Sequence, residues 1–200
     1  MKKYLIVISI ICCVLCLCLA YLHIEKRVTK FELPQGELKW SNVRPVSAKM
    51  CIPAAFTGPN GKIIGSYRVA GHTHQNGKAM KMKVSLKGDT FVLGSNWVGD
   101  YGFQQLTLVN NSKPMRFKDS RRAMRRALCK SKDKTFIIES NYPMKISSFA
   151  YYCSKHCEYA VYLDMGEYGY GYIKQGHFIR PLHIIGLFTK HKQTNWIYIE

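Results

Sequence analysis

An aspartate at the end of an apolar run is the residue best placed to do chemistry. Asp164 follows Ala160–Leu163, and two glycines, Gly166 and Gly169, come soon after it. A buried strand would fix the carboxylate, and the glycines would let backbone N–H groups approach a bound anion closely. The competing interpretation is a turn rich in glycine and tyrosine that Asp164 caps with its own side chain. The spacing alone does not separate the two.

A basic segment supplies the second candidate group. Ten Lys or Arg residues and only two acids lie between Lys113 and Lys134. Arg125 and Arg126 precede an apolar strand and are the better candidates for holding a phosphate, because a guanidinium binds phosphate through two parallel hydrogen bonds. Arg121 and Arg122 are typical of a solvated basic face, which would also suit anionic lipid.

A cysteine-histidine group is the weaker candidate for a site. Cys153, His156 and Cys157 lie close together on an expected helix, but nothing supplies an obvious fourth ligand or a second cysteine pair. Buried thiols are the ordinary interpretation of such cysteines. We therefore expect no metal, and no motif indicates a cofactor.

Composition limits the classes of protein to which the chain can belong. Of 200 residues, 30 are Lys or Arg and 12 are Asp or Glu, so the formal net charge is 30 − 12 = +18. Because 47% of the residues are hydrophobic and 12% are aromatic, the chain is not a disordered basic tail. Nucleic acid is not expected as a partner, because no basic helix, zinc finger or RNA-binding aromatic motif occurs.

The N-terminal segment predicts export. Lys2 and Lys3 precede Tyr4–Leu22, a run of 19 uncharged residues. A helix of that length is about 28 Å long, which approaches the thickness of the hydrocarbon core of a bilayer. We expect residues 1–23 to be an anchor in the cytoplasmic membrane, with the rest facing outward to the periplasm or cell envelope. A cleaved signal peptide followed by secretion is the second interpretation.

The remaining chain divides into a tether and one domain. Residues 24–49 carry prolines and mixed charge with little periodicity and predict a tether, and residues 50–200 are enough for one core. Alternating or continuous apolar runs predict strands, with hairpins at Gly88-Asp89 and Lys132-Asp133. A helix capped by Ser147 or Ser148 is expected to end at Cys157. The fold class is therefore α+β: a single domain with a mixed, largely antiparallel sheet flanked by about two helices, plus the N-terminal transmembrane or signal helix.

The ordered set of short motifs resembles the phosphodiester glycosidase domain family. The segments that carry the resemblance are 51–57 (CIPAAFT), 65–67 (GSY), 103–109 (FQQLTLV), 125–128 (RRAL), 137–140 (IIES), 163–166 (LDMG) and 193–196 (QTNW).

This resemblance implies an exported hydrolase that cleaves a sugar-1-phosphodiester, with the sugar phosphodiester or an anionic envelope glycan as its ligand. The family's Asp-Gly strand end falls on Asp164 and Gly166, and its arginine-containing strand falls on Arg125 or Arg126. Its aromatic position falls on Phe56, and Gln105 lies in another matching segment. The candidate set is thus Asp164, Glu139 and Glu167 for catalysis, and Arg125, Arg126, Gly166, Gly169, Gln105 and Phe56 for binding.

The sequence also departs from the family pattern. Pro53 replaces an asparagine, and Met165 and Glu167 interrupt a glycine-rich stretch. Two alternatives therefore stay open: a binding module that holds a phosphodiester-linked envelope glycan without cleaving it, and a basic structural protein at the membrane surface. The sequence does not determine the oligomeric state.

Overall fold

Three antiparallel sheets form the body of the protein in a computed structural model. The structure describes residues 9–16, 27–58, 60–132, 134–165, 171–175, 178–181 and 194–200. The first sheet has the order β1 (Val28–Glu32), β13 (Lys134–Ser140), β12 (Arg126–Ser131), β15 (Tyr159–Leu163), β9 (Thr107–Asn110) and β10 (Lys113–Pro114). The second has the order β17 (Phe178–Pro181), β16 (Tyr172–Gln175), β3 (Met50–Pro53), β18 (Trp196–Ile199) and β2 (Lys39–Ser41). The third has the order β5 (His72–Asn76), β4 (Gly65–Val69), β8 (Tyr101–Gln104), β6 (Lys83–Lys87) and β7 (Thr90–Gly94). Two short strands, β11 (Arg122–Ala123) and β14 (Met144–Lys145), form a separate pair.

The six-stranded sheet is covered on both faces. Leu128 of β12 and Val161 of β15 belong to a core shared with the two five-stranded sheets, whereas their neighbours Cys129 and Ala160 belong to a core under the helix α2 (Ile146–Ser154). Adjacent strand residues point to opposite faces, so a strand covered on both sides must be apolar at consecutive positions. The prediction of a doubly covered strand over residues 160–163 is confirmed.

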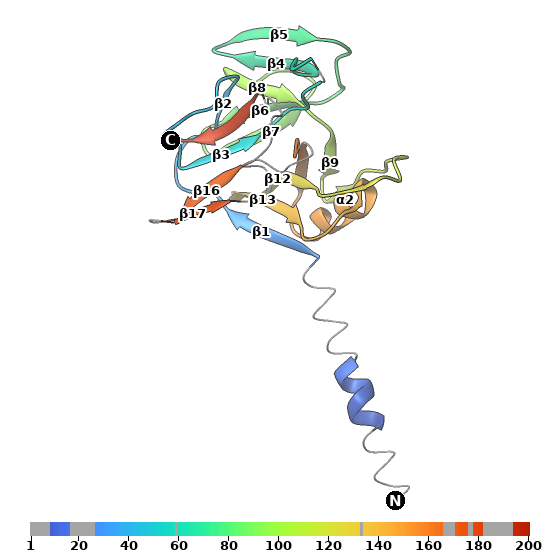
Figure 1. Ribbon diagram of the computed structural model, residues 1–200. Helices are drawn as coiled ribbons and strands as arrows, with labels where there is room; N and C mark the ends of the chain where they lie inside the picture. The colour runs from blue at the N-terminus through green and yellow to red at the C-terminus, as the bar shows by residue number, and fades with distance from the viewer. Residues whose placement is uncertain are drawn as a thin grey trace, which may run out of the picture.

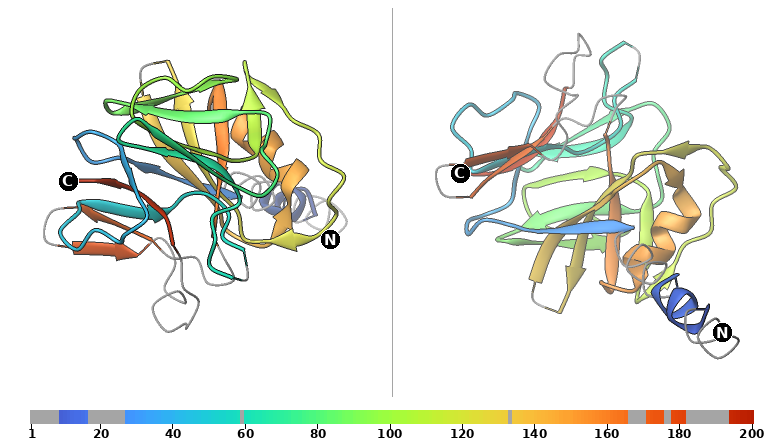
Figure 2. Two further views of the ribbon diagram at one scale, coloured as in Figure 1. Left: turned by 90° about the horizontal axis from the view of Figure 1, so that it is seen from above. Right: turned by 60° about the horizontal axis from the view of Figure 1, so that its bottom comes forward.

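The layers follow from these two cores. Figure 1 and both views in Figure 2 show α2 on one side of β12 and β15 and the strands β4–β8 on the other. The α+β expectation of largely antiparallel pairing with few helices is confirmed for the described residues, where every strand pair is antiparallel. The strands divide among several sheets rather than one, and α2 is the helix that packs on them.

The start and end of α2 differ from the prediction. The N-cap residue is Lys145, with no side-chain cap, and the hydroxyl of Ser147 instead exchanges hydrogen bonds with the backbone of Phe117. The helix ends at Ser154, so His156 lies beyond it and is exposed. A serine next to an apolar run suggests a cap, but here the hydroxyl serves a neighbouring loop instead.

The segment predicted as a tether contributes two strands to the sheets. β1 pairs along its whole length with β13, and β2 pairs with β18. Leu38 and Trp40 are 1% exposed and lie in the larger core. The expectation of a tether over residues 24–49 is therefore corrected for Val28–Ser41: a short strand at a sheet edge needs only one partner and shows little periodicity in the sequence.

The N-terminal run is described only in part. Residues 9–16 are helical, and the side chains of Ile10, Ile11, Val14 and Leu15 are each more than half exposed. Within the described ranges, no helix has the length and apolar character needed to cross a membrane. Residues 4–8 and 17–22 of the predicted span lie outside the described residues, and the anchor stays a prediction.

A buried thiol in β3 predicts a loss of stability at alkaline pH. Cys51 is 1% exposed, and burial raises the pKa of its thiol from 9.0 to about 11, although Arg44 lowers it. The unfolded chain releases this proton first, so the stabilisation is complete below pH 9 and is lost as the pH rises towards 11. Raising the pH from 8 to 10.5 should therefore lower the contribution of this thiol to the free energy of unfolding by about 2 kcal/mol. We expect the difference in unfolding free energy between the wild type and Cys51→Ala, measured with urea at both pH values, to shrink by that amount. A constant difference would contradict the prediction.

Candidate active site

Three strand ends meet at one edge of the six-stranded sheet. β12 is antiparallel to both β13 and β15, so its first residue lies beside the C-terminal ends of these two strands. Arg126 is in register with Glu139 on one side and with Leu163 on the other. The position after Leu163 is Asp164. The sheet therefore brings three of the predicted site residues, Arg126, Glu139 and Asp164, to one place from distant parts of the chain.

Arg126 and Glu139 form a buried ion pair. Nη2 of Arg126 lies 3.0 Å from Oε1 of Glu139, and the two side chains are 0% and 4% exposed. Directly opposed residues of neighbouring strands point to the same face, here the face of the larger core. Removing two charges from water costs several kcal/mol per ion, and the attraction between these two opposite charges offsets part of that cost.

The carboxylate of Asp164 is held from across the fold. Its backbone N–H donates to the Ala54 carbonyl at 2.9 Å, and its Oδ2 accepts a hydrogen bond from the Thr57 N–H at 3.1 Å. Asp164 is 9% exposed. The Thr57 bond joins the end of β15 to the segment after β3, so the carboxylate does more than cap its own turn. A carboxylate fixed in this way meets the positional requirement for acid-base chemistry.

The segment that holds Asp164 is itself clamped by two buried amides. Asn195 accepts from the Ala55 N–H at 2.6 Å and donates to the Ala55 carbonyl at 3.0 Å. Gln105 donates to the Ala54 carbonyl at 3.4 Å and accepts from the Leu106 N–H at 2.8 Å. The structure therefore gives Gln105, predicted to bind ligand, two hydrogen bonds that position the backbone.

Asn195 and Thr57 lie in segments that carry the family resemblance, but neither is among the site residues predicted from the sequence. Asn195 is 0% exposed and stands directly before β18, whose residues alternate between buried and half-buried. A single polar residue at the head of such a strand is a signal that a backbone clamp is present, although it does not identify what is clamped. The side chain of Thr57 gives no indication of its role, because Thr57 contributes its backbone N–H to Asp164.

An aromatic pair lies beside the site, on the face of α2. The rings of Phe56 and Tyr162 are 5.4 Å apart between centroids and are tilted by 42°. Burial raises the pKa of the Tyr162 hydroxyl; Arg125 and Arg126 lower it, and Asp164 raises it. These opposing influences show that Asp164 and both arginines act on one phenol. Phe56, predicted to bind ligand, thus lies within the same group of residues.

Arg125 points away from its neighbour Arg126. It is 5% exposed, and its guanidinium donates to the Met144 carbonyl at 3.3 Å, to the Tyr162 hydroxyl at 3.3 Å and to the Arg121 carbonyl at 2.9 Å. These bonds tie the residue before β12 to β14, to β15 and to the residue before β11. Of the two arginines that the sequence leaves open, Arg126 is the one that faces Glu139.

Glycine is required where the chain passes Arg126. A Cβ at Gly171 would lie 3.3 Å from Nη1 of Arg126 and 3.4 Å from the Cys51 carbonyl oxygen, at a φ of +138° that side chains rarely adopt. The candidate residues Gly166, Glu167 and Gly169 precede it and lie outside the described residues.

Metal ligands do not gather in the part of the chain that the structure describes. No group of three or more His, Cys, Asp or Glu side chains there is arranged to hold an ion. Cys153 and Cys157 are buried, and the Cys157 thiol donates to the Cys153 carbonyl. Burial, together with these two neighbouring thiols, raises the pKa of Cys129 well above its ordinary value.

Comparison with known proteins identifies the architecture. The chain matches no protein-family model and no curated protein sequence. Among solved structures it matches the catalytic domain of zebrafish N-acetylglucosamine-1-phosphodiester alpha-N-acetylglucosaminidase, auto-inhibited by its pro-peptide, with 10% sequence identity and a TM-score of 0.54. The match covers 82% of this chain and 72% of that one. The resemblance found in the sequence is thus confirmed at the level of architecture, and the chain has a phosphodiester glycosidase-like fold.

Proposed function

We propose that the protein is a hydrolase that cleaves a sugar-1-phosphodiester at its glycosidic bond. One observation carries the proposal: Asp164 and the buried Arg126–Glu139 pair meet at one sheet edge. The shared fold with a phosphodiester glycosidase catalytic domain supports the reaction class.

The reaction needs one carboxylate and one positive group. Water adds to C1 of the sugar, the bond from C1 to the phosphate oxygen breaks, and the products are a free sugar and a phosphate monoester. The leaving group is a stable anion. Its departure therefore depends more on stabilising negative charge than on donating a proton.

The residues divide these tasks. Asp164 acts at C1, as the base that activates water or as the nucleophile, which are the usual carboxylate roles in glycoside cleavage. Arg126 stabilises the charge that develops on the phosphate. Glu139 positions the guanidinium of Arg126. Gly166 and Gly169 remain the candidate residues for binding the same anion and Glu167 the candidate second carboxylate, all three outside the described residues.

The charge of the whole molecule favours such a substrate. The net charge of +18 raises the local concentration of anions and their association rate. In this proposal the domain faces outward from the cytoplasmic membrane, where the substrate is a phosphodiester-linked glycan of the cell envelope.

A binding module without turnover is the second candidate function. The side chain of Arg126 is 0% exposed, so substrate reaches the guanidinium only if the surrounding residues move. A site that never opens to the guanidinium would hold the glycan at its rim and leave the bond intact.

Parallel turnover and binding measurements on the full chain separate these functions. The substrates are methyl phosphodiesters of N-acetylglucosamine, glucose and galactose, each linked through the anomeric oxygen, and the control is methyl N-acetylglucosaminide, which lacks phosphate. Release of reducing sugar from a phosphodiester and none from the control supports the hydrolase. Saturable binding without release supports the binding module. Neither binding nor release of any phosphodiester contradicts both.

A further inference from the structure

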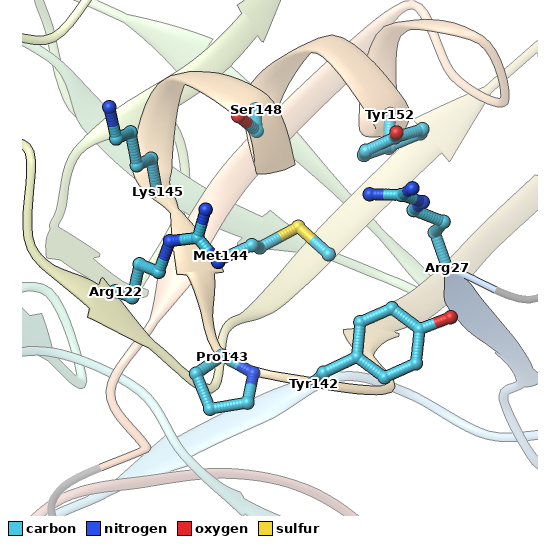
Figure 3. Close-up of a pocket in the computed structure, with 8 residues that line it drawn as sticks. All are labelled: Arg27, Arg122, Tyr142, Pro143, Met144, Lys145, Ser148 and Tyr152. Carbon is cyan, nitrogen blue, oxygen red and sulfur yellow. The ribbon is translucent and has the colours of Figure 1, made fainter. Parts of the chain in front are cut away.

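A separate cationic pocket lies at the start of α2. It has a volume of about 450 Å³ and is bordered by β14, by the first turns of α2 and by Arg27, which directly precedes β1. Figure 3 shows Arg27 and Arg122 on opposite sides of it, with Lys145 and Ser148 above and Tyr142 below. None of these residues belongs to the proposed active site.

The pocket wall is positively charged. Arg27, Arg122 and Lys145 line it, and no acidic residue does. Within the described ranges, none of these three cations takes part in an ion pair. Most other lining groups are neutral hydrogen-bonding or apolar side chains, so the pocket has the composition of an anion site.

Two of the cations are forced together by strand pairing. Arg122 of β11 is directly opposite Lys145 of β14 in the antiparallel register. Like charges at directly opposed positions destabilise a strand pair, and this pair consists of only two residues on each side. An anion between the two side chains would turn that repulsion into attraction.

A buried donor of Arg27 also lacks an acceptor. In the described part of the chain, the Nε atom of Arg27 is shielded from solvent and has no hydrogen-bond partner. A buried N–H without an acceptor costs about 1–3 kcal/mol, which a bound oxygen recovers only if the Arg27 side chain shifts to expose Nε. The Arg27 guanidinium lies across the pocket from that of Arg122, with the Met144 side chain drawn between them (Figure 3), so an anion in the pocket has positive charge on both sides.

We propose that this pocket binds a phosphate group. Phosphate offers several acceptor oxygens to guanidinium and ammonium groups, and the uncapped first turn of α2 adds a favourable dipole. Two sources share this chemistry: the headgroup of an anionic phospholipid, and a small free phosphate. The place of Arg27 favours the lipid, because it follows the apolar run that ends at Leu22 by only a few residues, and residues 9–16 of that run expose apolar side chains.

The test measures ligand binding to the full chain in nonionic detergent by calorimetry. The ligands are dihexanoyl phosphatidylglycerol, dihexanoyl phosphatidylcholine and inorganic phosphate. The pocket variant is Arg27→Gln with Arg122→Gln. Its matched control is Arg44→Gln with Arg116→Gln, which removes the same charge from exposed positions outside the pocket.

We expect saturable binding of phosphatidylglycerol that weakens at least tenfold in the pocket variant and less than twofold in the control. We also expect phosphatidylcholine to bind at least tenfold more weakly than phosphatidylglycerol. These results together would establish the site and assign it to the lipid headgroup. Binding of inorganic phosphate with the same dependence on the pocket assigns it to a free phosphate. Equal loss in both double variants, or no binding of either anion to the wild type, overturns the proposal. Circular dichroism of each variant excludes unfolding as the cause of a loss.

Discussion

Replacing Asp164 by asparagine is expected to slow cleavage of a sugar-1-phosphodiester by about 10²–10⁴-fold, the contribution usual for a positioned acid-base group. The substitution keeps the size of the side chain. An amide oxygen still accepts the hydrogen bond from the Thr57 N–H that the Asp164 carboxylate accepts at 3.1 Å. The chain therefore keeps its fold and loses the negative charge and the basicity. The measurement is kcat/KM for release of reducing sugar, together with the midpoint of thermal unfolding.

Asp100→Asn is the matched control for this experiment. Asp100 is an exposed carboxylate in the turn before β8, in a different sheet from Asp164. It should keep wild-type turnover within about twofold, as expected for a surface substitution. If Asp164→Asn folds normally and cleaves as fast as Asp100→Asn, Asp164 has no catalytic role and another carboxylate must be sought.

Those features of the fold that depend on local pattern were predicted well. The apolar run before Asp164 predicted a doubly covered strand, and the turn residues at Lys132-Asp133 predicted the hairpin of β12 and β13. Both signals are local, because burial on two faces and a change of chain direction leave their mark on consecutive residues.

The division into several sheets was not predictable in the same way. Val28–Glu32 has no strong alternation, yet it pairs with β13 more than a hundred positions later. A strand of this kind is stabilised by its partner rather than by its own residues. The same limit applies to the site: the sequence left Arg125 and Arg126 open, and the register with Glu139 is what separates them.

Asn195 illustrates what the sequence lacked. Its two hydrogen bonds to Ala55 hold the segment that binds Asp164, over a separation of 140 residues. Both residues lie in segments that carry the family resemblance, but the residue types alone do not indicate that the two segments meet. Positioning residues of this kind emerge only from the three-dimensional arrangement, whereas Asp164 itself was found from its place at the end of an apolar run.

Removing the charge of Glu139 is expected to lower the free energy of unfolding by about 3–5 kcal/mol. Glu139→Gln keeps the side chain's length but deprives the Arg126 guanidinium, which is 0% exposed, of the carboxylate 3.0 Å away. Breaking a buried pair on one side costs this much because the remaining charge is still removed from water. Urea unfolding of the full chain measures the change, with Glu158→Gln as the control at a more exposed carboxylate. A loss below about 1 kcal/mol would mean that water or another carboxylate offsets the charge of Arg126 once Glu139 is neutral.

The double variant Arg126→Met with Glu139→Leu then separates stability from function. Replacing a whole buried ion pair with apolar side chains of similar volume is often neutral or stabilising. The free energy of unfolding of this variant should therefore be higher than that of the wild type, or lower by no more than about 1 kcal/mol. If the pair serves the chemistry, the same variant should lose turnover, because the phosphate no longer meets a guanidinium. A stable double variant that still cleaves the substrate would show that the pair is only structural. A stable variant without activity would explain why two charges are kept in a core where two apolar residues would be at least as stable.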